Sequence, residues 1–324
     1  MKKIAILFCA AFALLLGSCE KEDALNVAPI ESKYNLEDDP NDPVQHFIYE
    51  TYRDYGIVVI TNPTEEDYKY NFTNQNLLEL VPPAQTPEVL QAGVEFLKRN
   101  FLDLYSTEFK KQYMPFTLIL AESVINRAHG GSDYVDTYSS KGMLIISNVD
   151  ENMGALPAET EKQYRASVNA AFWSSFMGGV RQLFTVPDEF YTVSGGESGD
   201  EGAYRRYNSS SKYTMEIDWD TFETIFVPNP DYVELPDASF WYKEGFVNLK
   251  PVVTEDPDYP YYDGWEIQFP QPSEDLPLWV EFIFSHTDAE IEELCRTYEK
   301  VQQKYVIVKK ALEDAGCDLG LITQ

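Results

Sequence analysis

A run of apolar residues near the middle of the chain constrains the fold most. Residues 158–184 carry large apolar side chains at every fourth position, which predicts one long helix with a buried face. That face consists of Tyr164, Val168, Phe172, Phe176 and Val180. From Val168 to Val180 there is no His, Glu, Asp or Cys. We therefore expect this helix to form the centre of a core without supplying acid–base groups or metal ligands.

The flanking segments predict one mixed α+β domain over residues 43–324, with a small mixed sheet. Short apolar runs such as FTLIL and MLIIS are typical of buried strands, and Thr86-Pro87 is a typical helix start. A capping box begins at Thr287, and Gly316 stands where the last helix would end. The expected strands are 57–62, 116–120 and 143–147, and the expected helices are 47–55, from 86, 158–184, 275–284 and one C-terminal helix from 288 to about 315.

The N-terminus predicts export. Two lysines precede an apolar run of thirteen residues, which is too short to span a membrane in the mature protein. Leu16-Gly17-Ser18-Cys19 resembles the lipobox of bacterial lipoproteins, which implies a signal peptide at 1–18 and lipid attachment at Cys19. The acidic residues that follow resemble the export tag of surface-exposed lipoproteins, and residues 19–42 are expected to form an acidic tether. The implied location is the outer membrane, lipid-anchored and exposed at the cell surface. The alternative is an ordinary signal peptide with an incidental cysteine.

Charge and cysteine content narrow the function classes. The chain has 25 basic and 54 acidic residues, a formal charge of −29, which argues against binding to nucleic acid or to anionic membrane surfaces. Besides Cys19, the mature chain would keep two cysteines, Cys295 and Cys317. On one continuous helix they would lie roughly 33 Å apart, too far for a disulfide. We interpret Cys295 as a small core residue.

An irregular aromatic-rich insert is expected at about 195–270. Residues 204–270 contain sixteen aromatic side chains in 67 residues. Aromatic rings among prolines and acids either pack onto the domain or form a platform for a sugar or peptide. The candidate ligand-binding residues are Tyr259, Tyr261, Tyr262 and Trp265. Asp218, Asp220 and Glu223 are expected to form a solvated acidic turn rather than a calcium loop.

Several segments together resemble the substrate-import-associated zinc metallohydrolase lipoproteins, a family of zinc-binding metallopeptidases. The resemblance runs from about residue 44 to the C-terminus, and it implies a zincin-like fold. Its segments are FIYETYRDYGIVV, Leu80-Val81-Pro82-Pro83, VPDEFYTVSGG, Gly245-Phe246-Val247, the block from Glu274 to Glu281, HTDAEIEELC and QKYVIVKKAL. The family also implies partners, namely a TonB-dependent importer and its surface binding protein.

The zinc motif of that family is absent. In HExxH the two histidines lie on one helix face and share Zn²⁺, and the glutamate accepts a proton from the bound water. Aligned on the resemblance, Ala170 and Ser174 replace the histidines and Ala171 replaces the glutamate. A third family ligand would fall at Glu274, Asp275 or Glu281, but one carboxylate alone does not retain zinc. We therefore expect no catalytic residue, no metal ligand set and no zinc.

Three function hypotheses follow. The first is a pseudoenzyme, an accessory binding protein of a nutrient-import system that holds a peptide or glycan in the old cleft. The second is an active zinc metallohydrolase with a relocated site, which would have to recruit His46, His129 or His286 from distant segments. The third is a structural accessory of an importer complex. We interpret His46 and His286 as surface or helix-capping residues.

Overall fold

The computed structural model describes residues 33–69, 77–127, 133–140, 142–194 and 206–322. The chain divides into two units, Met1–Leu36 and Glu37–Gln324, and the architecture below is that of the second. Cys19, the predicted signal peptide, His129 and residues 195–205 lie outside the described residues. No helix within the described ranges is long and apolar enough to cross a membrane.

The main sheet has the order β1-β3-β7-β6. Its strands are β1 (Val58–Ile60), β3 (Thr117–Leu120), β7 (Met143–Ile146) and β6 (Thr137–Ser140). β3 pairs in parallel with β1 and β7, while β6 pairs antiparallel with β7. The apolar runs of β1, β3 and β7 are almost completely buried, as expected for strands covered on both faces. The three predicted strands are confirmed, and the half-buried TYSS sequence of β6 forms the edge.

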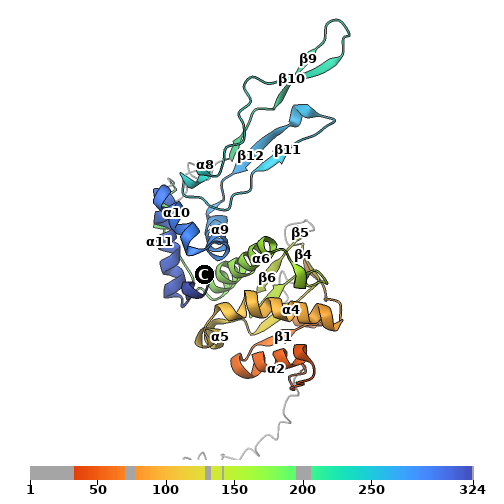
Figure 1. Ribbon diagram of the computed structural model, residues 1–324, viewed down its shortest axis with the longest axis vertical. Coiled ribbons are helices and arrows are strands. Elements are labelled where there is room, and N and C mark those ends of the chain that lie inside the picture. The colour runs from red at the N-terminus through yellow and green to blue at the C-terminus, as the bar shows by residue number, and fades with distance from the viewer. Residues whose placement is uncertain (1–32, 70–76, 128–132, 141, 195–205, 323–324) are drawn as a thin grey trace, which may run out of the picture. The chain divides into compact units, whose positions relative to one another are not determined.

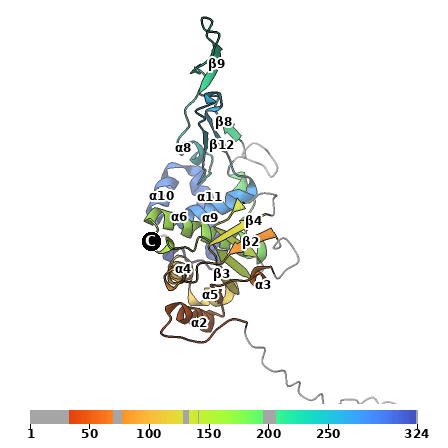
Figure 2. The same cartoon turned by 90° about the vertical axis from the view of Figure 1, so that its right-hand side faces the viewer.

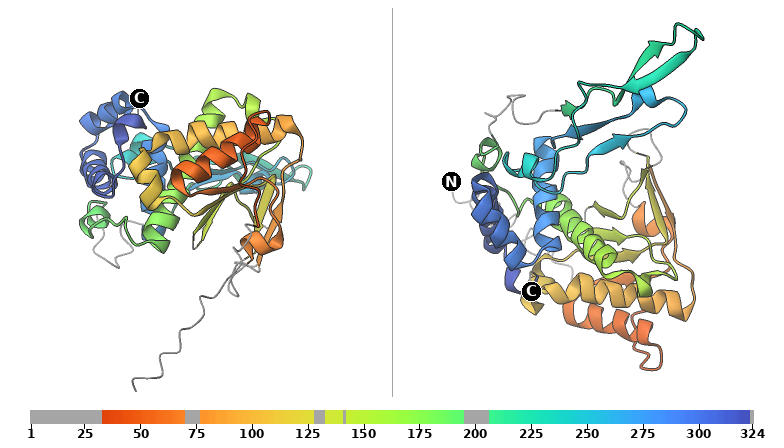
Figure 3. Two further views of the ribbon diagram at one scale, coloured as in Figure 1. Left: turned by 90° about the horizontal axis from the view of Figure 1, so that it is seen from below. Right: turned by 45° about the horizontal axis from the view of Figure 1, so that its top comes forward.

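Helices and a second sheet surround this centre. α2 (Pro43–Tyr55) and α4 (Pro87–Asn100) lie side by side (Figure 3), and α5 (Thr107–Tyr113) contacts α2. The Asp42 and Thr86 side chains cap α2 and α4 by accepting hydrogen bonds from free backbone N–H groups. β2 (Leu78–Val81), β4 (Ser123–Asn126) and β5 (Asp133–Tyr134) form an antiparallel sheet. The shorter helices are α3 (Glu65–Tyr68), η2 (Leu102–Leu104), η3 (Met153–Ala155), α7 (Glu189–Thr192) and η6 (Leu319–Leu321).

The central helix is an α-helix only in its first half. α6 spans Ala158–Ala170, and a π-helix, η4, continues over Ala171–Val180. The predicted long helix is therefore present, but it ends four residues before Phe184 and its second half is a π-helix. A step of four residues overshoots a turn of 3.6 residues by about 40°. The wider π-turn reverses that drift, so that Phe172 and Phe176 both stay buried. Phe172 packs against the rings of Phe101, Tyr105 and Phe109 and stacks on Phe176, while Phe184 contacts Trp173. Val180, expected on the same face, is 37% exposed.

A second long helix lies along the first. α9 (Pro272–Ser285) packs beside α6 (Figure 1) and buries Trp279, Val280 and a run of three residues, Phe282–Phe284. A capping box between Gln271 and Glu274 begins it. Pro277, inside the helix, has no N–H to donate to the carbonyl of Ser273.

The C-terminal segment forms two helices, not one. α10 (Asp288–Thr297) and α11 (Glu299–Asp314) are separated by Tyr298, whose backbone is extended at φ −124° and ψ 105°. The break lets α10 pack on α11 while α11 packs on α7 and α9. A single straight helix over both segments could not fold back on itself in this way. Gly316 ends α11 with a left-handed φ of 94°, as predicted.

Both cysteines of the described segments are free thiols. Cys295 is half-buried, so its assignment to the core was wrong, whereas Cys317 is buried. Burial raises the pKa of both thiols above the ordinary value for cysteine.

The insert is more regular than its composition suggested. β11 (Val252–Thr254), β12 (Gly264–Gln268) and β8 (Arg206–Asn208) form one antiparallel sheet, and β9 (Tyr213–Ile217) and β10 (Thr224–Pro228) form a separate hairpin (Figure 2). α8 (Ser239–Tyr242) and the 3₁₀ turn η5 (Pro260–Tyr262) complete it. The insert has a small hydrophobic core of its own, made of Trp241, Phe246, Ile267 and Phe269.

A buried ion pair joins three helices to the insert. Nζ of Lys304 in α11 donates to Oδ2 of Asp275 in α9 at 2.6 Å, and both side chains are at most 1% exposed. The ammonium group lies 4.5 Å and 4.6 Å from the ring centroids of Phe190 and Phe246. Burial lowers the pKa of Lys304, and the negative charge of Asp275 opposes that shift. The pair and its two rings therefore fix α9, α11, α7 and the insert against one another.

Asp275→Ala should destabilise the fold by about 3–5 kcal/mol, because it leaves a buried ammonium without a counter-charge. The measurement is urea unfolding followed by circular dichroism. The matched control is Lys300→Ala, which removes the partly exposed Lys300–Glu244 pair on the same helix and should cost about 1 kcal/mol or less. The double variant Asp275→Leu/Lys304→Met should recover much of the loss. Equal costs for Asp275→Ala and Lys300→Ala would contradict a structural role for the pair.

Candidate functional site

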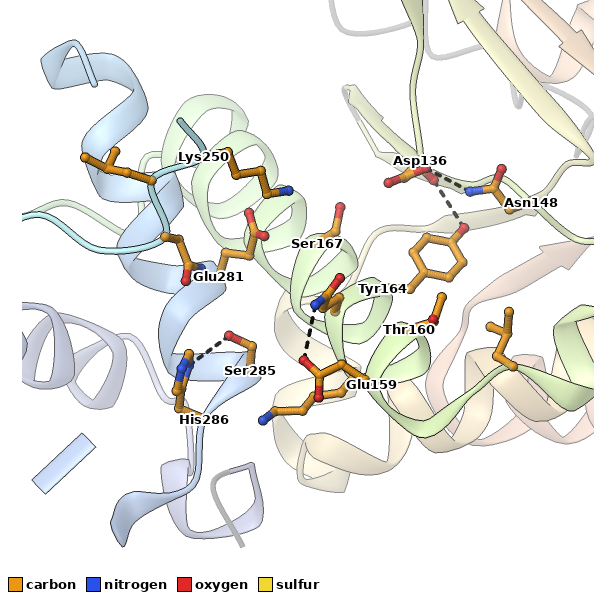
Figure 4. Close-up of a pocket in the computed structure, with 15 residues that line it drawn as sticks. Asp136, Asn148, Glu159, Thr160, Tyr164, Ser167, Lys250, Glu281, Ser285 and His286 are labelled. Atoms are coloured by element: carbon orange, nitrogen blue, oxygen red, sulfur yellow. Dashed lines mark hydrogen bonds between the residues drawn. The ribbon is translucent and has the colours of Figure 1, made fainter. Parts of the chain in front are cut away.

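A polar hollow in the described part of the chain lies beside α6 and α9. It encloses about 620 Å³ (Figure 4). α6 and α9 supply most of its wall, and the ends of β6 and β7 and the segment Asn248–Lys250 complete it. Its polar lining includes Asp136, Asn148, Gln163, Tyr164, Ser167, Lys250, Glu281 and His286.

A polar stripe on α6 forms one side of this hollow. Thr160, Gln163, Tyr164 and Ser167 follow at intervals of three or four residues and so share a helix face. The hydroxyl of Tyr164 donates to the backbone carbonyls of Ser147 and Asp136, and burial raises its pKa. Tyr164 thus ties α6 to the strand ends, while Nε2 of Gln163 donates to Oε1 of Glu159 on the same helix at 3.1 Å.

Glu281 is the titratable group of α9 at this hollow. It is half-buried, and burial raises the pKa of its carboxyl group. The charge of Asp136 raises that pKa further, whereas the charge of Lys250 lowers it. Figure 4 shows Lys250 and Glu281 pointing toward each other across from Ser167, with Asp136 on the opposite side. A carboxyl group with a perturbed pKa at the wall of a cleft is a typical feature of a functional site.

A second hollow of about 520 Å³ adjoins the first. The two share Asn248, Leu249, Lys250 and Glu281, so the Asn248–Lys250 segment and Glu281 lie between them. Ser273 and Pro277 line the second hollow. Together the two hollows form what we call the α6–α9 cleft.

Two asparagines with left-handed backbones line the cleft. Asn148 has a φ of 56° and Asn248 a φ of 55°. Asparagine tolerates this conformation better than most residues. The Asn148 side chain donates to Oδ1 of Asp136 at 2.8 Å and so holds that carboxylate in place. Sharp turns with fixed polar groups at a cleft are consistent with a pre-formed binding site.

The described histidines do not form a shared site. His286 ends α9 at the edge of the cleft, and its Nδ1 lies 2.8 Å from the carbonyl of Phe282 and 3.0 Å from Oγ of Ser285. Burial lowers the pKa of His286. His46 lies in α2, 2.7 Å from Asp38, where a hydrogen bond to that carboxylate raises its pKa. His286 therefore caps a helix end, and His46 makes a surface ion pair.

The positions aligned with the zinc motif lie elsewhere on the helix. Ala170 ends α6, and Ala171 and Ser174 lie in the π-helix η4. None of the three lines the two hollows. Oγ of Ser174 is buried and makes no hydrogen bond among the described atoms. Ser167 and Gln163, which line the cleft, lie one to three helical turns earlier.

The residues at these positions do not fit a zinc ion. Alanine offers no ligand atom, and Ser174 offers one neutral hydroxyl group. Of the three candidate third ligands, Glu274 takes part in the capping box of α9, Asp275 pairs with Lys304, and Glu281 lines the cleft. Within the described ranges, no group of three or more His, Cys, Asp or Glu side chains is arranged to hold a metal ion.

The candidate aromatic residues divide into two kinds. Tyr259, Tyr261 and Tyr262 are 60%, 44% and 63% exposed, and their rings contact one another at 5.1–6.4 Å. Trp265 is half-buried, and its indole N–H donates to the carbonyl of Val233 at 2.8 Å. Trp265 therefore has a structural role, whereas the three tyrosines remain a candidate platform.

Sequence reasoning named Glu281 but missed Gln163, Ser167 and Lys250. The sequence did contain a sign of these residues. Thr160, Gln163 and Ser167 form a polar stripe beside the apolar face of the predicted helix. Only the pairing of α6 with α9 shows that this stripe faces a cleft and not open solvent.

Comparisons with known proteins give a likeness of fold. The chain is similar to a crystal structure from Bacteroides caccae ATCC 43185 described as a "putative zinc-binding metallo-peptidase". The sequence identity is 16%, the TM-score is 0.47, and the match covers 89% of this chain and 92% of that one. At this level the likeness does not bear on activity. No family model and no curated protein matches the chain.

Glu281→Gln should stabilise the protein at neutral pH, because it removes a carboxylate whose charge burial disfavours. A carboxyl group with a raised folded-state pKa loses its proton first in the unfolded chain. Stability of the natural protein therefore falls as pH rises from the unfolded pKa, near 4.3, through the higher folded one. The gain from Glu281→Gln should be absent below that window and complete above it, as measured by urea unfolding at several pH values. Asp136→Asn should lower the pKa of Glu281 and reduce the gain. A gain that does not change with pH would contradict the assignment.

Proposed function

We propose that this protein is a non-catalytic binding protein, with the α6–α9 cleft as its ligand site. The ligand class is a peptide or a glycan, and the protein acts as an accessory of a nutrient-import system. The scaffold resembles that of zinc metallopeptidases, but on this proposal it binds its ligand without cleaving it.

The observation that carries this proposal is the composition of the cleft. A carboxylate at Glu281, an ammonium group at Lys250 and the polar stripe of α6 converge on about 620 Å³. A hollow of this size holds a few amino-acid or sugar residues. Charges of both signs and neutral donors and acceptors suit the amide, hydroxyl and terminal groups of such ligands.

The loss of catalysis is supported by the residues at the aligned motif. Hydrolysis by a zinc peptidase needs a metal held by several ligands and a base close to its water molecule. Ala170, Ala171 and Ser174 supply neither, and the described carboxylates of α9 have other partners or lie apart from those three positions. The alternative, a relocated zinc site, has no cluster to support it in the described ranges, while His129 lies outside them.

The cellular setting is part of the same proposal. Leu16-Gly17-Ser18-Cys19 supports a lipid anchor at Cys19, and the acidic tether supports exposure at the cell surface. A TonB-dependent importer and its surface binding protein are the partners that the resemblance suggests.

Elemental analysis tests the loss of zinc. The full chain, purified without chelator and dialysed against zinc, should retain well under one equivalent per chain. Zinc bound in stoichiometric amounts and removed by a chelator would overturn the proposal in favour of a relocated site.

Binding to arrays of peptides and oligosaccharides tests the cleft. Any ligand found should bind about tenfold more weakly to Lys250→Ala and to Glu281→Gln, about 1.4 kcal/mol for each charged contact. Lys243→Ala, an exposed lysine outside both hollows, is the matched control and should leave affinity unchanged. Equal effects of Lys243→Ala and Lys250→Ala would place the ligand outside the cleft. If affinity fell only in Tyr262→Ala, the ligand site would be the exposed tyrosines and not the cleft.

A further inference from the structure

The β9–β10 hairpin exposes an apolar surface that the cleft does not use. Its strands pair only with each other among the described strands. Met215 and Ile217 of β9 are 55% and 52% exposed, and Trp219 and Phe222 in the connecting loop are 74% and 77% exposed. Large apolar side chains exposed in one cluster mark an interaction site more often than single exposed ones do.

Most of these side chains lie on one face. Met215 pairs with Phe226 across the hairpin, and Ile217 pairs with Thr224. Directly paired residues of an antiparallel ladder share a face, and so do alternate residues of one strand. We call the set of Met215, Ile217, Phe226 and the two loop residues Trp219 and Phe222 the arm surface. β9 also contacts η5, which carries two of the exposed tyrosines.

Hydrogen bonds order the backbone of the loop at the end of the hairpin, and its two aromatic rings contact each other. Oδ1 of Asp218 accepts hydrogen bonds from the N–H groups of Asp220 and Thr221, and the carbonyl of Asp218 accepts one from Phe222. Those backbone donors keep the pKa of Asp218 below its ordinary value. The rings of Trp219 and Phe222 meet edge to face with centroids 6.5 Å apart. A pre-formed pair of rings loses little conformational entropy when it binds.

Phe222 occupies a backbone conformation that disfavours it. Its φ is 59°, in the left-handed region where glycine or asparagine is under less strain than a bulky aromatic residue. Folding alone would favour glycine here. Because the ring of Phe222 is exposed, its burial within the chain does not offset that strain. A contact with another molecule therefore explains the phenylalanine better than folding does.

The negative charge around the arm surface indicates which class of partner it can bind. Residues 213–242 contain seven acidic side chains and no Lys, Arg or His. The acidic residues are Glu216, Asp218, Asp220, Glu223, Asp231, Glu234 and Asp237. An anionic lipid surface would repel this segment, and so would a second copy of a chain with a net charge of −29. Apolar rings surrounded by carboxylates complement an apolar pocket with basic residues at its rim.

We propose that the β9–β10 hairpin is a docking arm for a protein surface that combines an apolar pocket with Lys or Arg side chains. The arm binds by inserting Trp219 and Phe222 into that pocket, while Asp220 and Glu223 pair with the basic rim. This function is separate from ligand binding in the α6–α9 cleft and does not depend on it.

The test uses the full chain and synthetic peptides of two matched series. Both series alternate Leu or Phe with charged residues, which are Lys or Arg in one and Glu in the other. Fluorescence anisotropy should show that the basic series binds at least about tenfold more tightly than the acidic series, with an affinity that falls as salt is added. Vesicles of phosphatidylcholine with phosphatidylglycerol, and sedimentation of the chain alone, are measured in parallel.

Three variants separate binding from folding. Phe222→Gly should keep or raise stability, because it relieves the left-handed strain, and should weaken binding of the basic series about tenfold. Asp220→Lys/Glu223→Lys should reverse the preference between the two series. Val306→Ala, an exposed apolar residue on α11, is the control and should change neither property. Equal binding of both series, tighter binding to vesicles, self-association lost in Phe222→Gly, or no binding would each overturn the proposal.

Discussion

The structure depends on one buried ion pair, in which the ammonium group of Lys304 is shielded from solvent. A buried charge is costly, so it is tolerated only with a counter-charge and well-placed neighbours. Asp275 supplies the counter-charge, and the faces of Phe190 and Phe246 supply the remaining contacts. Because these groups come from α9, α11, α7 and the insert, the pair is stable only when all four segments have folded. We infer that they assemble cooperatively.

The same helix carries the pair and the cleft. Asp275 lies in the first turn of α9, and Glu281 lies six residues later on the wall of the cleft. The buried pair fixes the start of α9, and the long contact with α6 fixes the rest. The polar groups of the cleft therefore project from rigid elements, with Tyr164 and Asn148 holding the opposite wall. Pro277 lies between the pair and Glu281 in the sequence and lines the second hollow together with Ser273.

The sequence predicted the elements whose signals are local. The buried strands, the caps at Thr86 and Thr287 and the left-handed Gly316 were all predicted, because residue type and short spacing determine them. The π-helix, the break at Tyr298 and the strands of the insert were not, because neighbouring segments determine them. The helix widens to a π-helix where Phe172 and Phe176 are buried, and Phe172 packs there against Phe101, which is distant in the sequence. No local sequence pattern specifies such a contact. The cleft was missed for the same reason, since Ser167 and Lys250 meet only through tertiary packing.

The two thiols bear on how the chain responds to oxidants. Disulfide exchange requires a thiolate that can reach a partner sulfur atom. Cys317 is buried, and its raised pKa keeps it protonated at neutral pH. Half-buried Cys295 is shielded to a lesser degree. Cys317 is therefore open to oxidants only before the C-terminal helices have packed. The packing that builds the C-terminal part of the core thus also keeps the Cys317 sulfur atom out of reach of a reactive partner.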